Sequence, residues 1–269
     1  MSYKRKERIE HPCFSESAAQ RYARVHLPVA PKCNIRCKYC DKSGDCMNEN
    51  RPGMASKVLT PEEAFELFCR NYSEDVSVAG VSGPGDPLAN IEETIQTFEL
   101  IRKHYPSVNL CLSTNGVLFE KYYQDLMNVG VKYITLTINT LSIKNAEKIY
   151  EWAQNGTRKL YGRSAAEYIV ESQKRAREII SSNKFFNVKI NTVYLPGIND
   201  KEVDNIVKWC NEAHVMMYNL LPFIKTEKCK LDVPAGSREK VCEVARKYEN
   251  EITIMHHCKQ CRADAIGMI

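Results

Sequence analysis

The chain has 269 residues, 43% of them hydrophobic and 26% charged, which is enough for one large globular domain with a full core. The formal net charge is +5, and apart from a short basic stretch near the N-terminus the basic residues alternate with acidic ones, so a nucleic-acid partner is not expected. No apolar run approaches the 18 or so residues of a membrane span, which argues against a membrane protein.

Strands and helices alternate along the chain. We predict strands at residues 24–30, 76–82, 108–113, 131–138, 187–195 and 215–223, and a short last strand at 252–255. We predict helices at residues 61–71, 91–105, 119–129, 143–152, 165–180, 201–213 and 238–248, with an outer loop at 154–163. The helix at 61–71 begins with a capping box formed by Thr60 and Glu63. Six strands that alternate with helices predict an α/β fold with parallel pairing, an incomplete TIM-like (β/α)6 barrel.

The N-terminus is charged and has no apolar run typical of a signal peptide, so a cytoplasmic location is expected. Cysteines in a reducing compartment rarely form disulfides. The twelve cysteines are therefore expected to be metal ligands or small core residues.

Three cysteines follow the first predicted strand with the spacing C-x3-C-x2-C: Cys33, Cys37 and Cys40. Three thiolates can hold three irons of a 4Fe-4S cube and leave the fourth iron open for chemistry. The alternatives are a zinc knuckle or buried thiols, but zinc sites favour paired C-x2-C units. With Tyr39 before the last cysteine, the segment resembles the signature of the radical S-adenosylmethionine (SAM) superfamily. That resemblance implies that SAM binds the open iron and is cleaved to a 5′-deoxyadenosyl radical, and it implies the same barrel.

The chemistry of such barrels lies at the C-terminal ends of the strands. The candidates for SAM binding are therefore polar or glycine residues at these ends, where ordinary turn formation and strand-end capping are the alternative explanation. Together with Tyr39 they are Gly83, Gly85, Asp86, Ser113, Asn115, Asn139 and Asn191.

Cysteines outside the triplet fall into two groups. Cys69, Cys210, Cys229 and Cys242 are predicted to be structural thiols. The others are candidate ligands of two auxiliary 4Fe-4S clusters, together with a histidine: His11, Cys13, Cys46, Cys111, Cys258 and Cys261. Six ligands are fewer than the eight that two closed clusters need, although His256 or His257 could also bind. We expect one domain over residues 1–269, with cluster-binding extensions at 1–22 and 256–269 around a barrel at 23–255.

Nine segments in order resemble the NifB family of nitrogenase-cofactor maturases. They include His11-Pro12-Cys13, Cys33 to Cys40, Gly83-Pro84-Gly85-Asp86-Pro87-Leu88-Ala89-Asn90, Pro196-Gly197-Ile198-Asn199-Asp200 and His257-Cys258-Lys259-Gln260-Cys261. The resemblance implies that the two auxiliary clusters are the substrate and are fused, with a SAM-derived carbide and an added sulfur, into the 8Fe-9S-C precursor of the iron-molybdenum cofactor. It also implies catalytic roles for Glu49 and Arg51, where a surface ion pair is the alternative.

The family further implies partners: iron-sulfur cluster donors, a cofactor carrier or scaffold, and an electron donor. We expect a monomer that binds neither nucleic acid nor membrane. Two other functions compete with the maturase. One is a radical SAM enzyme with permanent auxiliary clusters that modifies a peptide or small molecule, and the other is a non-enzymatic iron-sulfur carrier.

This chain departs from the family at three places. Gln20 and Tyr218 stand where the family usually has histidine, and the loop after Pro222 is shorter. These departures predict a cluster site that is altered or more exposed.

Overall fold

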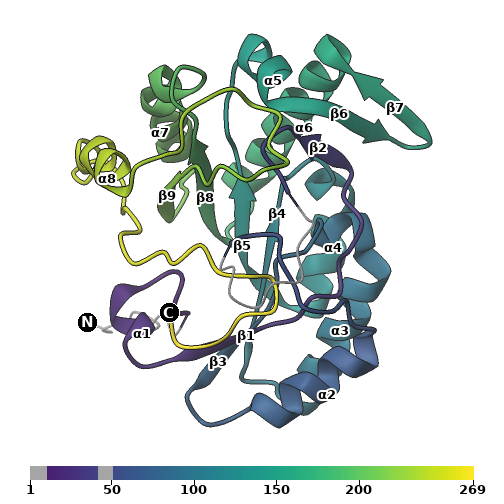
Figure 1. Cartoon of the computed structure of the whole chain (residues 1–269). Helices are drawn as coiled ribbons and strands as arrows, with labels where there is room; N and C mark the ends of the chain where they lie inside the picture. Colours follow the sequence, from purple (N-terminus) through teal and green to yellow (C-terminus); the bar gives the residue numbers. More distant parts are fainter. Residues whose placement is uncertain (1–10, 42–50) are drawn as a thin grey trace.

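The computed structural model describes residues 11–41 and 51–269. Its main sheet has seven strands in the order β10-β1-β3-β4-β5-β8-β9, and the six from β1 to β9 are parallel, as predicted. The six are β1 (Ala23–His26), β3 (Val76–Val81), β4 (Asn109–Thr114), β5 (Val131–Thr137), β8 (Asn187–Tyr194) and β9 (Met217–Pro222). The sheet curls into an open half-barrel (Figure 1), which confirms the predicted fold class.

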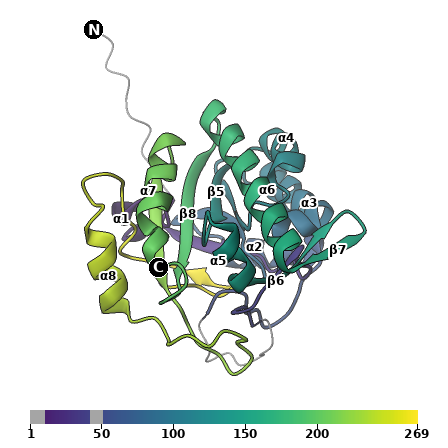
Figure 2. The same ribbon diagram turned by 90° about the horizontal axis from the view of Figure 1, so that it is seen from above.

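Helices cover the outer face of this sheet (Figures 1 and 2). They are α2 (Pro61–Asn71), α3 (Ile91–His104), α4 (Phe119–Val129), α6 (Gly162–Ser182), α7 (Val203–Glu212) and α8 (Arg238–Arg246). The capping box at Thr60 is present, with both reciprocal hydrogen bonds to Glu63. In the described part of the chain, no helix is both long and apolar enough to span a membrane.

Alternate residues of β8 face opposite sides of the sheet. Ile190 and Tyr194 pack in the core under the helices, whereas Lys189, Asn191 and Val193 line cavities on the inner face. Polar side chains of the barrel strands thus gather inside the half-barrel, as the period-2 geometry of a strand requires.

The prediction for residues 143–163 was wrong in its second half. Helix α5 (Ile143–Ile149) ends early, and β6 (Tyr150–Asn155) and β7 (Arg158–Tyr161) form a hairpin in place of the expected loop. Gly156 in the two-residue turn has φ +57°, a conformation that glycine adopts without strain. Strand β2 (Ile35–Cys37) adds to this hairpin as a third, antiparallel strand. Residues 150–155 are therefore extended because they pair with a segment more than 100 positions away.

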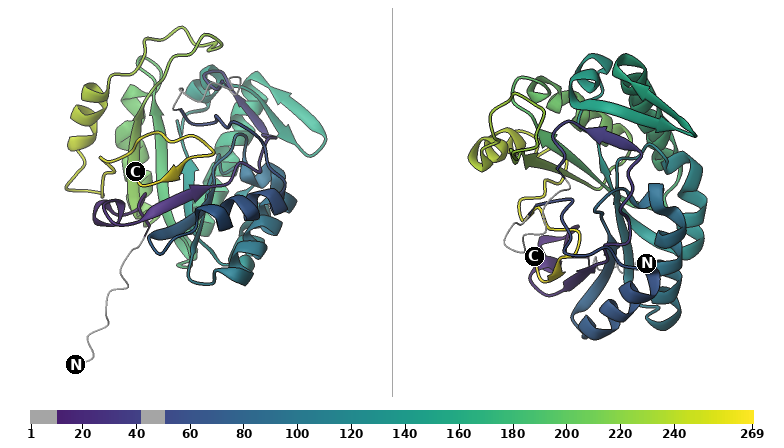
Figure 3. Two further views of the ribbon diagram at one scale, coloured as in Figure 1. Left: turned by 60° about the horizontal axis from the view of Figure 1, so that its bottom comes forward. Right: turned by 45° about the vertical axis from the view of Figure 1, so that its right-hand side comes forward.

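The other differences are shorter strands and small unpredicted elements. The first strand is shorter than predicted, and residues 252–255 contribute only a single bridge, from Ile254 to Tyr218. Unpredicted elements are the short helix α1 (Glu16–Ala19), the 3-10 turns η1 (Pro87–Asn90) and η2 (Asp200–Glu202), and β10 (Ile266–Gly267), which pairs antiparallel with β1. Residues 11–26 and the C-terminal segment from residue 257 onward lie side by side across the open side of the half-barrel (Figure 3).

Candidate functional site

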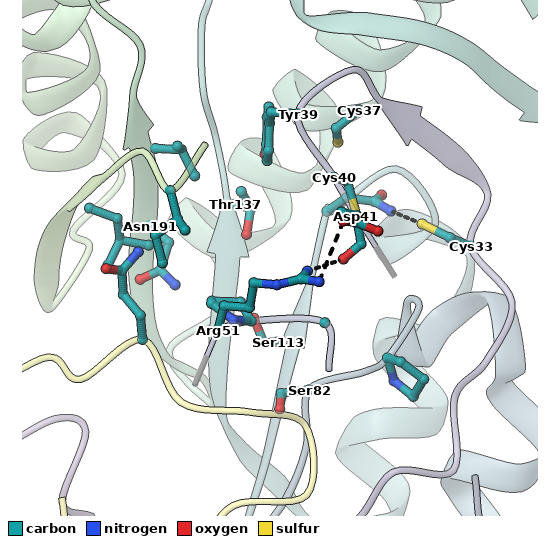
Figure 4. Close-up of a pocket in the computed structure, with 18 of the residues that line it drawn as sticks. Cys33, Cys37, Tyr39, Cys40, Asp41, Arg51, Ser82, Ser113, Thr137 and Asn191 are labelled. Carbon is teal, nitrogen blue, oxygen red and sulfur yellow. Dashed lines mark hydrogen bonds and ion pairs between the residues drawn. The ribbon is translucent and has the colours of Figure 1, made fainter. Parts of the chain in front are cut away.

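A cavity of about 230 Å³ lies at the C-terminal ends of the parallel strands. Its lining includes Cys33, Cys37 and Cys40, and Figure 4 shows these side chains at one end of it. Of the residues predicted to bind SAM, those that line this cavity are Tyr39, Gly85, Asp86, Ser113, Asn115 and Asn191. The structure therefore brings most of the predicted SAM site together.

The cysteine segment is held by the small sheet. β2 pairs with β6 through Ile35 and Ala153, and the amide of Lys38 donates to the carbonyl of Ile149 at 2.8 Å. The segment is thus part strand. Residues 11–41 and 51–269 contain no three His, Cys, Asp or Glu side chains placed to hold a single metal ion. A 4Fe-4S cube would bind each cysteine through a different iron.

The turn at residues 83–86 packs directly on the cysteine segment. The amide of Gly85 donates to Ala30 at 2.5 Å and that of Asp86 to Lys32 at 2.8 Å. A Cβ on Gly85 would lie 2.0 Å from the Lys32 carbonyl oxygen, so glycine is required here for close backbone approach. Gly83 lines neither this cavity nor the second one described below.

The Asp86 carboxylate is occupied by the protein itself. It accepts hydrogen bonds from the amides of Leu88 (2.9 Å) and Asn115 (2.7 Å) and from the hydroxyl of Thr114 (2.9 Å). Asp86 therefore ties the turn to the end of β4. Sequence reasoning missed Asn90, whose side chain bonds both backbone groups of Lys32 at 3.1 and 2.8 Å.

Asn139 lies behind the cavity and is fully buried. Its amide nitrogen donates to the Tyr39 hydroxyl at 2.7 Å, and its side-chain oxygen accepts from the amide of Val193 at 2.9 Å. Burial raises the pKa of Tyr39 well above its usual value, so the phenol is neutral. Asn139 thus positions Tyr39 and does not line the cavity.

Two amides on the cavity wall have protein partners. Asn115 donates to the side chain of Asn34 at 2.7 Å and lies 3.9 Å from the Cys33 sulfur. Asn191 accepts from Asn219 at 3.0 Å.

Arg51 forms a buried ion pair with Asp41, at 3.5 Å, and also donates to the Asp41 carbonyl (Figure 4). Its guanidinium lines the cavity next to the cysteine segment, so the pair is not the surface pair considered as an alternative. Glu49 and Cys46 lie outside the described residues.

A second cavity lies inside the half-barrel and gathers the auxiliary candidates. Its lining includes His11, Cys13, Cys111, Cys258 and Cys261. Burial raises the pKa of the Cys13 and Cys111 thiols, so their thiolates require a bound cation. Six residues line both cavities: Pro52, Ser82, Ser113, Asn191, Leu221 and Gln260. The two cavities therefore adjoin.

The two histidines of this cavity differ in the protonation of Nε2. His26 Nδ1 donates to the Arg262 carbonyl at 3.0 Å, so its Nε2 carries a lone pair, as in most metal-binding histidines. Burial lowers its pKa to about 4, so the ring is neutral. Sequence reasoning did not consider His26 as a candidate ligand, although it stands in the strand leading to the cysteine triplet.

His11 has the opposite arrangement. Its Nδ1 accepts from the amide of Cys13 at 3.1 Å, which places the proton of the neutral ring on Nε2. This Nε2 is buried and has no hydrogen-bond partner among the described residues. In this orientation His11 is a hydrogen-bond donor toward a ligand in the cavity.

The C-terminal C-x2-C segment is fastened to β1. Arg24 donates to the Cys261 sulfur at 3.0 Å and to the Met268 carbonyl at 2.9 Å. His257 bonds the Pro12 carbonyl at 2.9 Å, and His256 pairs with Glu249 at the surface. Neither His256 nor His257 lines the second cavity.

The four cysteines predicted to be structural lie outside both cavities. Cys210 is fully buried in the core, and Cys69 is exposed on α2. Cys229 and Cys242 are partly buried.

The Radical SAM superfamily profile matches residues 27–210. A relative from Methanocaldococcus infernus, named FeMo cofactor biosynthesis protein NifB, is 38% identical over 263 residues, which are 96% of this chain and 85% of that protein. The chain belongs to the NifB family of radical SAM proteins.

Other NifB relatives are longer. The proteins of the same name from Chlorobaculum tepidum and Klebsiella pneumoniae are each 39% identical over 96% of this chain, which spans 62% and 57% of their lengths. Among solved structures, Streptococcus suis SuiB bound to S-adenosylmethionine aligns with a TM-score of 0.59 at 13% identity, over 86% of this chain and 49% of that chain. Methylornithine synthase (PylB) aligns at 0.57 and 14%, over 88% and 65%. These structures share the fold.

Membership in the radical SAM superfamily implies a 4Fe-4S cluster and SAM. The first cavity fits this requirement, because it combines three soft thiol donors with the Thr226 hydroxyl, a buried group that has no hydrogen-bond partner in the described chain. Thr226 lies in the loop after Pro222. Sequence reasoning did not select it as a site residue, because the only unusual feature of that loop in the sequence is its short length.

Two departures from the NifB pattern lie away from the cavities. Gln20 is exposed and caps the C-terminus of α1. Tyr218 is buried in the core with residues of α7 and α8, on the outer side of the sheet. The third departure, the shorter loop, does reach the site, since Phe223, Ile224 and Thr226 line the first cavity.

Proposed function

We propose that this chain fuses two 4Fe-4S clusters, with a SAM-derived carbide and an added sulfur, into the 8Fe-9S-C precursor of the nitrogenase iron-molybdenum cofactor. The observation that carries this proposal is the shared wall of the two cavities, one lined by the cysteine triplet and the other by Cys13, Cys111, Cys258 and Cys261. A radical formed in the first cavity would meet a substrate held in the second. The names of the curated relatives support the same reaction.

In this proposal Cys33, Cys37 and Cys40 would hold a 4Fe-4S cluster, which would bind SAM and pass on to it the electron of a low-potential donor. The Tyr39 ring closes one side of the cavity, where it faces Phe223 at a centroid distance of 6.4 Å. Both rings exclude water and other hydrogen donors from the radical. The turn at residues 83–86, fixed by Gly85 and Asp86, presents its backbone to SAM.

The substrate clusters would bind in the second cavity through its four cysteines and Cys46. His26 is the better nitrogen ligand by its lone-pair geometry, and His11 would donate a hydrogen bond to a cluster sulfide. Ser113 and Asn191, at the boundary between the cavities, would orient the reacting groups.

Two SAM molecules are consumed in this scheme. The first gives its methyl group to a sulfide of one substrate cluster and leaves as S-adenosylhomocysteine. The second takes one electron from a low-potential donor, and its C5′–S bond breaks to give methionine and a radical that removes a hydrogen atom from the methyl group. The remaining two hydrogens would leave as protons and the C–S bond would break, with the electrons that reduce the carbon to carbide supplied by the irons of the two substrate clusters. Arg51, buried in the first cavity and paired with Asp41, would stabilise a carboxylate or a sulfide anion.

The test is anaerobic incubation of the reconstituted chain with SAM and dithionite. The proposal expects both S-adenosylhomocysteine and 5′-deoxyadenosine. Formation of 5′-deoxyadenosine alone, with all iron retained after incubation with an acceptor protein, would favour permanent auxiliary clusters. Absence of SAM cleavage would favour a carrier.

Iron content provides a second measurement. About twelve irons per chain should fall to about eight when Cys33, Cys37 and Cys40 are replaced by alanine. Cys111→Ser should lower the auxiliary iron, whereas Cys69→Ser, at an exposed thiol on α2, is the matched control and should not. About four irons falling to none would contradict the maturase.

The proposed reaction also needs partners: a donor of iron-sulfur clusters, a low-potential electron donor, and a carrier or scaffold that accepts the product. We further propose that the chain acts as a monomer in the cytoplasm.

A further inference from the structure

Lys189 is a buried lysine inside the half-barrel. It lies on β8 between Thr135 of β5 and Met217 of β9, and its side chain lines the second cavity. Its exposed fraction is 4%. A lysine at such a position is unusual, because long charged side chains are almost never fully buried unless they are paired.

The contacts of its ammonium group do not neutralise its charge. Nζ lies 3.3 Å from the Cys13 carbonyl and 3.5 Å from the Met255 sulfur, and it stands 5.0 Å from the centre of the Phe14 ring. Within residues 11–41 and 51–269, Lys189 forms no ion pair, and no aspartate or glutamate side chain lines the second cavity. The last residue, Ile269, lines the cavity, but its terminal carboxylate forms no ion pair with Lys189. Burying a cation without a counter-charge is strongly unfavourable, so the arrangement points to an anion bound in this cavity.

The chemistry of the cavity identifies the anion. Four cysteines line it, and a 4Fe-4S core bound by thiolates carries net negative charge. The His11 Nε2–H group, which has no partner among described residues, belongs to the same end of the cavity, since His11 and Lys189 both contact Phe14. A cation and a hydrogen-bond donor together suit the sulfides of an anionic cluster.

We propose that Lys189 is a positioning residue that supplies the counter-charge for the substrate cluster bound next to Cys13. This inference rests on the proposed function, because it assumes that auxiliary clusters occupy the second cavity. A fixed positive charge beside a cluster favours its reduced, more negative state. The positive charge also attracts the cluster toward β8. Asn191, on the same strand, lines both cavities.

The test uses the variant in which Cys33, Cys37 and Cys40 are alanine, so that only auxiliary clusters give an electron paramagnetic resonance signal. In this background Lys189→Met should shift the reduction potential of an auxiliary cluster to a more negative value, and Lys189→Arg should largely restore it. Lys132→Met is the matched control, since Lys132 is exposed on the neighbouring strand β5, and it should leave the potential unchanged.

Two results would overturn the proposal: equal potentials for Lys189→Met and its parent with equal iron content, or an arginine variant that behaves like the methionine variant. If Lys189→Met binds no auxiliary iron, its reduction potential cannot be measured, and the iron content of Lys189→Arg decides between a charge role and a folding role. Iron uptake by Lys189→Arg alone supports a charge role, and failure of both variants assigns the lysine to folding. Absence of auxiliary iron in the parent variant would instead contradict the proposed function.

Discussion

Replacing Asn90 with alanine should loosen the cysteine segment from the turn that faces SAM. Asn90 is 3% exposed, and its amide makes three hydrogen bonds. Its oxygen accepts from the Lys32 amide at 3.1 Å, and its nitrogen donates to the carbonyls of Lys32 and Asp86, each at 2.8 Å. Lys32 immediately precedes Cys33, so these bonds fix the start of the segment that holds the SAM cluster.

The expected loss follows from these three bonds. Each contributes about 1 kcal/mol to the free energy of unfolding, so Asn90→Ala should cost about 3 kcal/mol. For a domain of this size that is a fall in Tm of roughly 6–12 °C. Asn90→Asp is the matched variant, because it keeps the acceptor for the Lys32 amide and places a carboxylate against two carbonyls. It should be at least as destabilising as alanine.

The assay is anaerobic thermal unfolding of the reconstituted chain, combined with the KM for SAM and the iron content. We expect a lower Tm, a raised KM and partial loss of the SAM-cluster iron, with auxiliary iron retained. A Tm within 1 °C of the wild-type value for Asn90→Ala would refute the reasoning, since it would mean that the side chain does not hold Lys32.

Three further predictions concern the same region. Gly85→Ala should abolish binding of SAM, measured by equilibrium dialysis, because its Cβ would lie 2.0 Å from the Lys32 carbonyl oxygen; unchanged affinity would contradict the close packing. Tyr39→Phe removes the hydrogen bond from Asn139, and the loss of about 1 kcal/mol should raise the KM for SAM roughly fivefold; an unchanged KM would contradict it. Burial opposes ionisation of Asp264, but hydrogen bonds lower its pKa to about 2. The ionised Asp264 carboxylate therefore stabilises the folded state fully above the unfolded pKa near 4, and this stabilisation is lost as the pH falls toward 2. Asp264→Asn should lower Tm by a constant amount from pH 8 to 5; a difference that grows or vanishes within this range would contradict the assignment.

The barrel could be predicted from sequence because its signals are local. Helices 61–71 and 119–129 have the predicted bounds, since a capping box at Thr60 and a left-handed Gly130 mark their ends within the neighbouring residues. The six parallel strands are apolar runs that end in turn residues. These features depend on a few adjacent positions.

The hairpin β6–β7 could not be predicted in this way. Ala146, Ile149, Tyr150 and Ala153 are all buried, at the spacing of one helical face, so periodicity favours a helix through residue 152. The backbone of residues 150–155 instead bonds with β2, a partner that no local pattern reveals.

Sequence placed the candidate site better than it assigned roles within it. The cysteines named as candidate ligands, apart from Cys46, line the two cavities. Cysteines are conspicuous in a sequence because few residue types bind metals through sulfur. The roles of His26, Asn90 and Lys189 depend on which way each side chain faces and on its partners, which only the folded chain defines.

The pairing of β2 with β6 sets an order for biosynthesis. Cys33 to Cys40 leave the ribosome early, but the strand that anchors them spans Tyr150–Asn155, and its own neighbour β7 ends at Tyr161. Closing so long a loop carries a large entropic cost, which is recovered only when both partners are present. We expect the triplet to acquire its cluster after residue 161 has emerged, so iron delivery to this site would be a late step of folding.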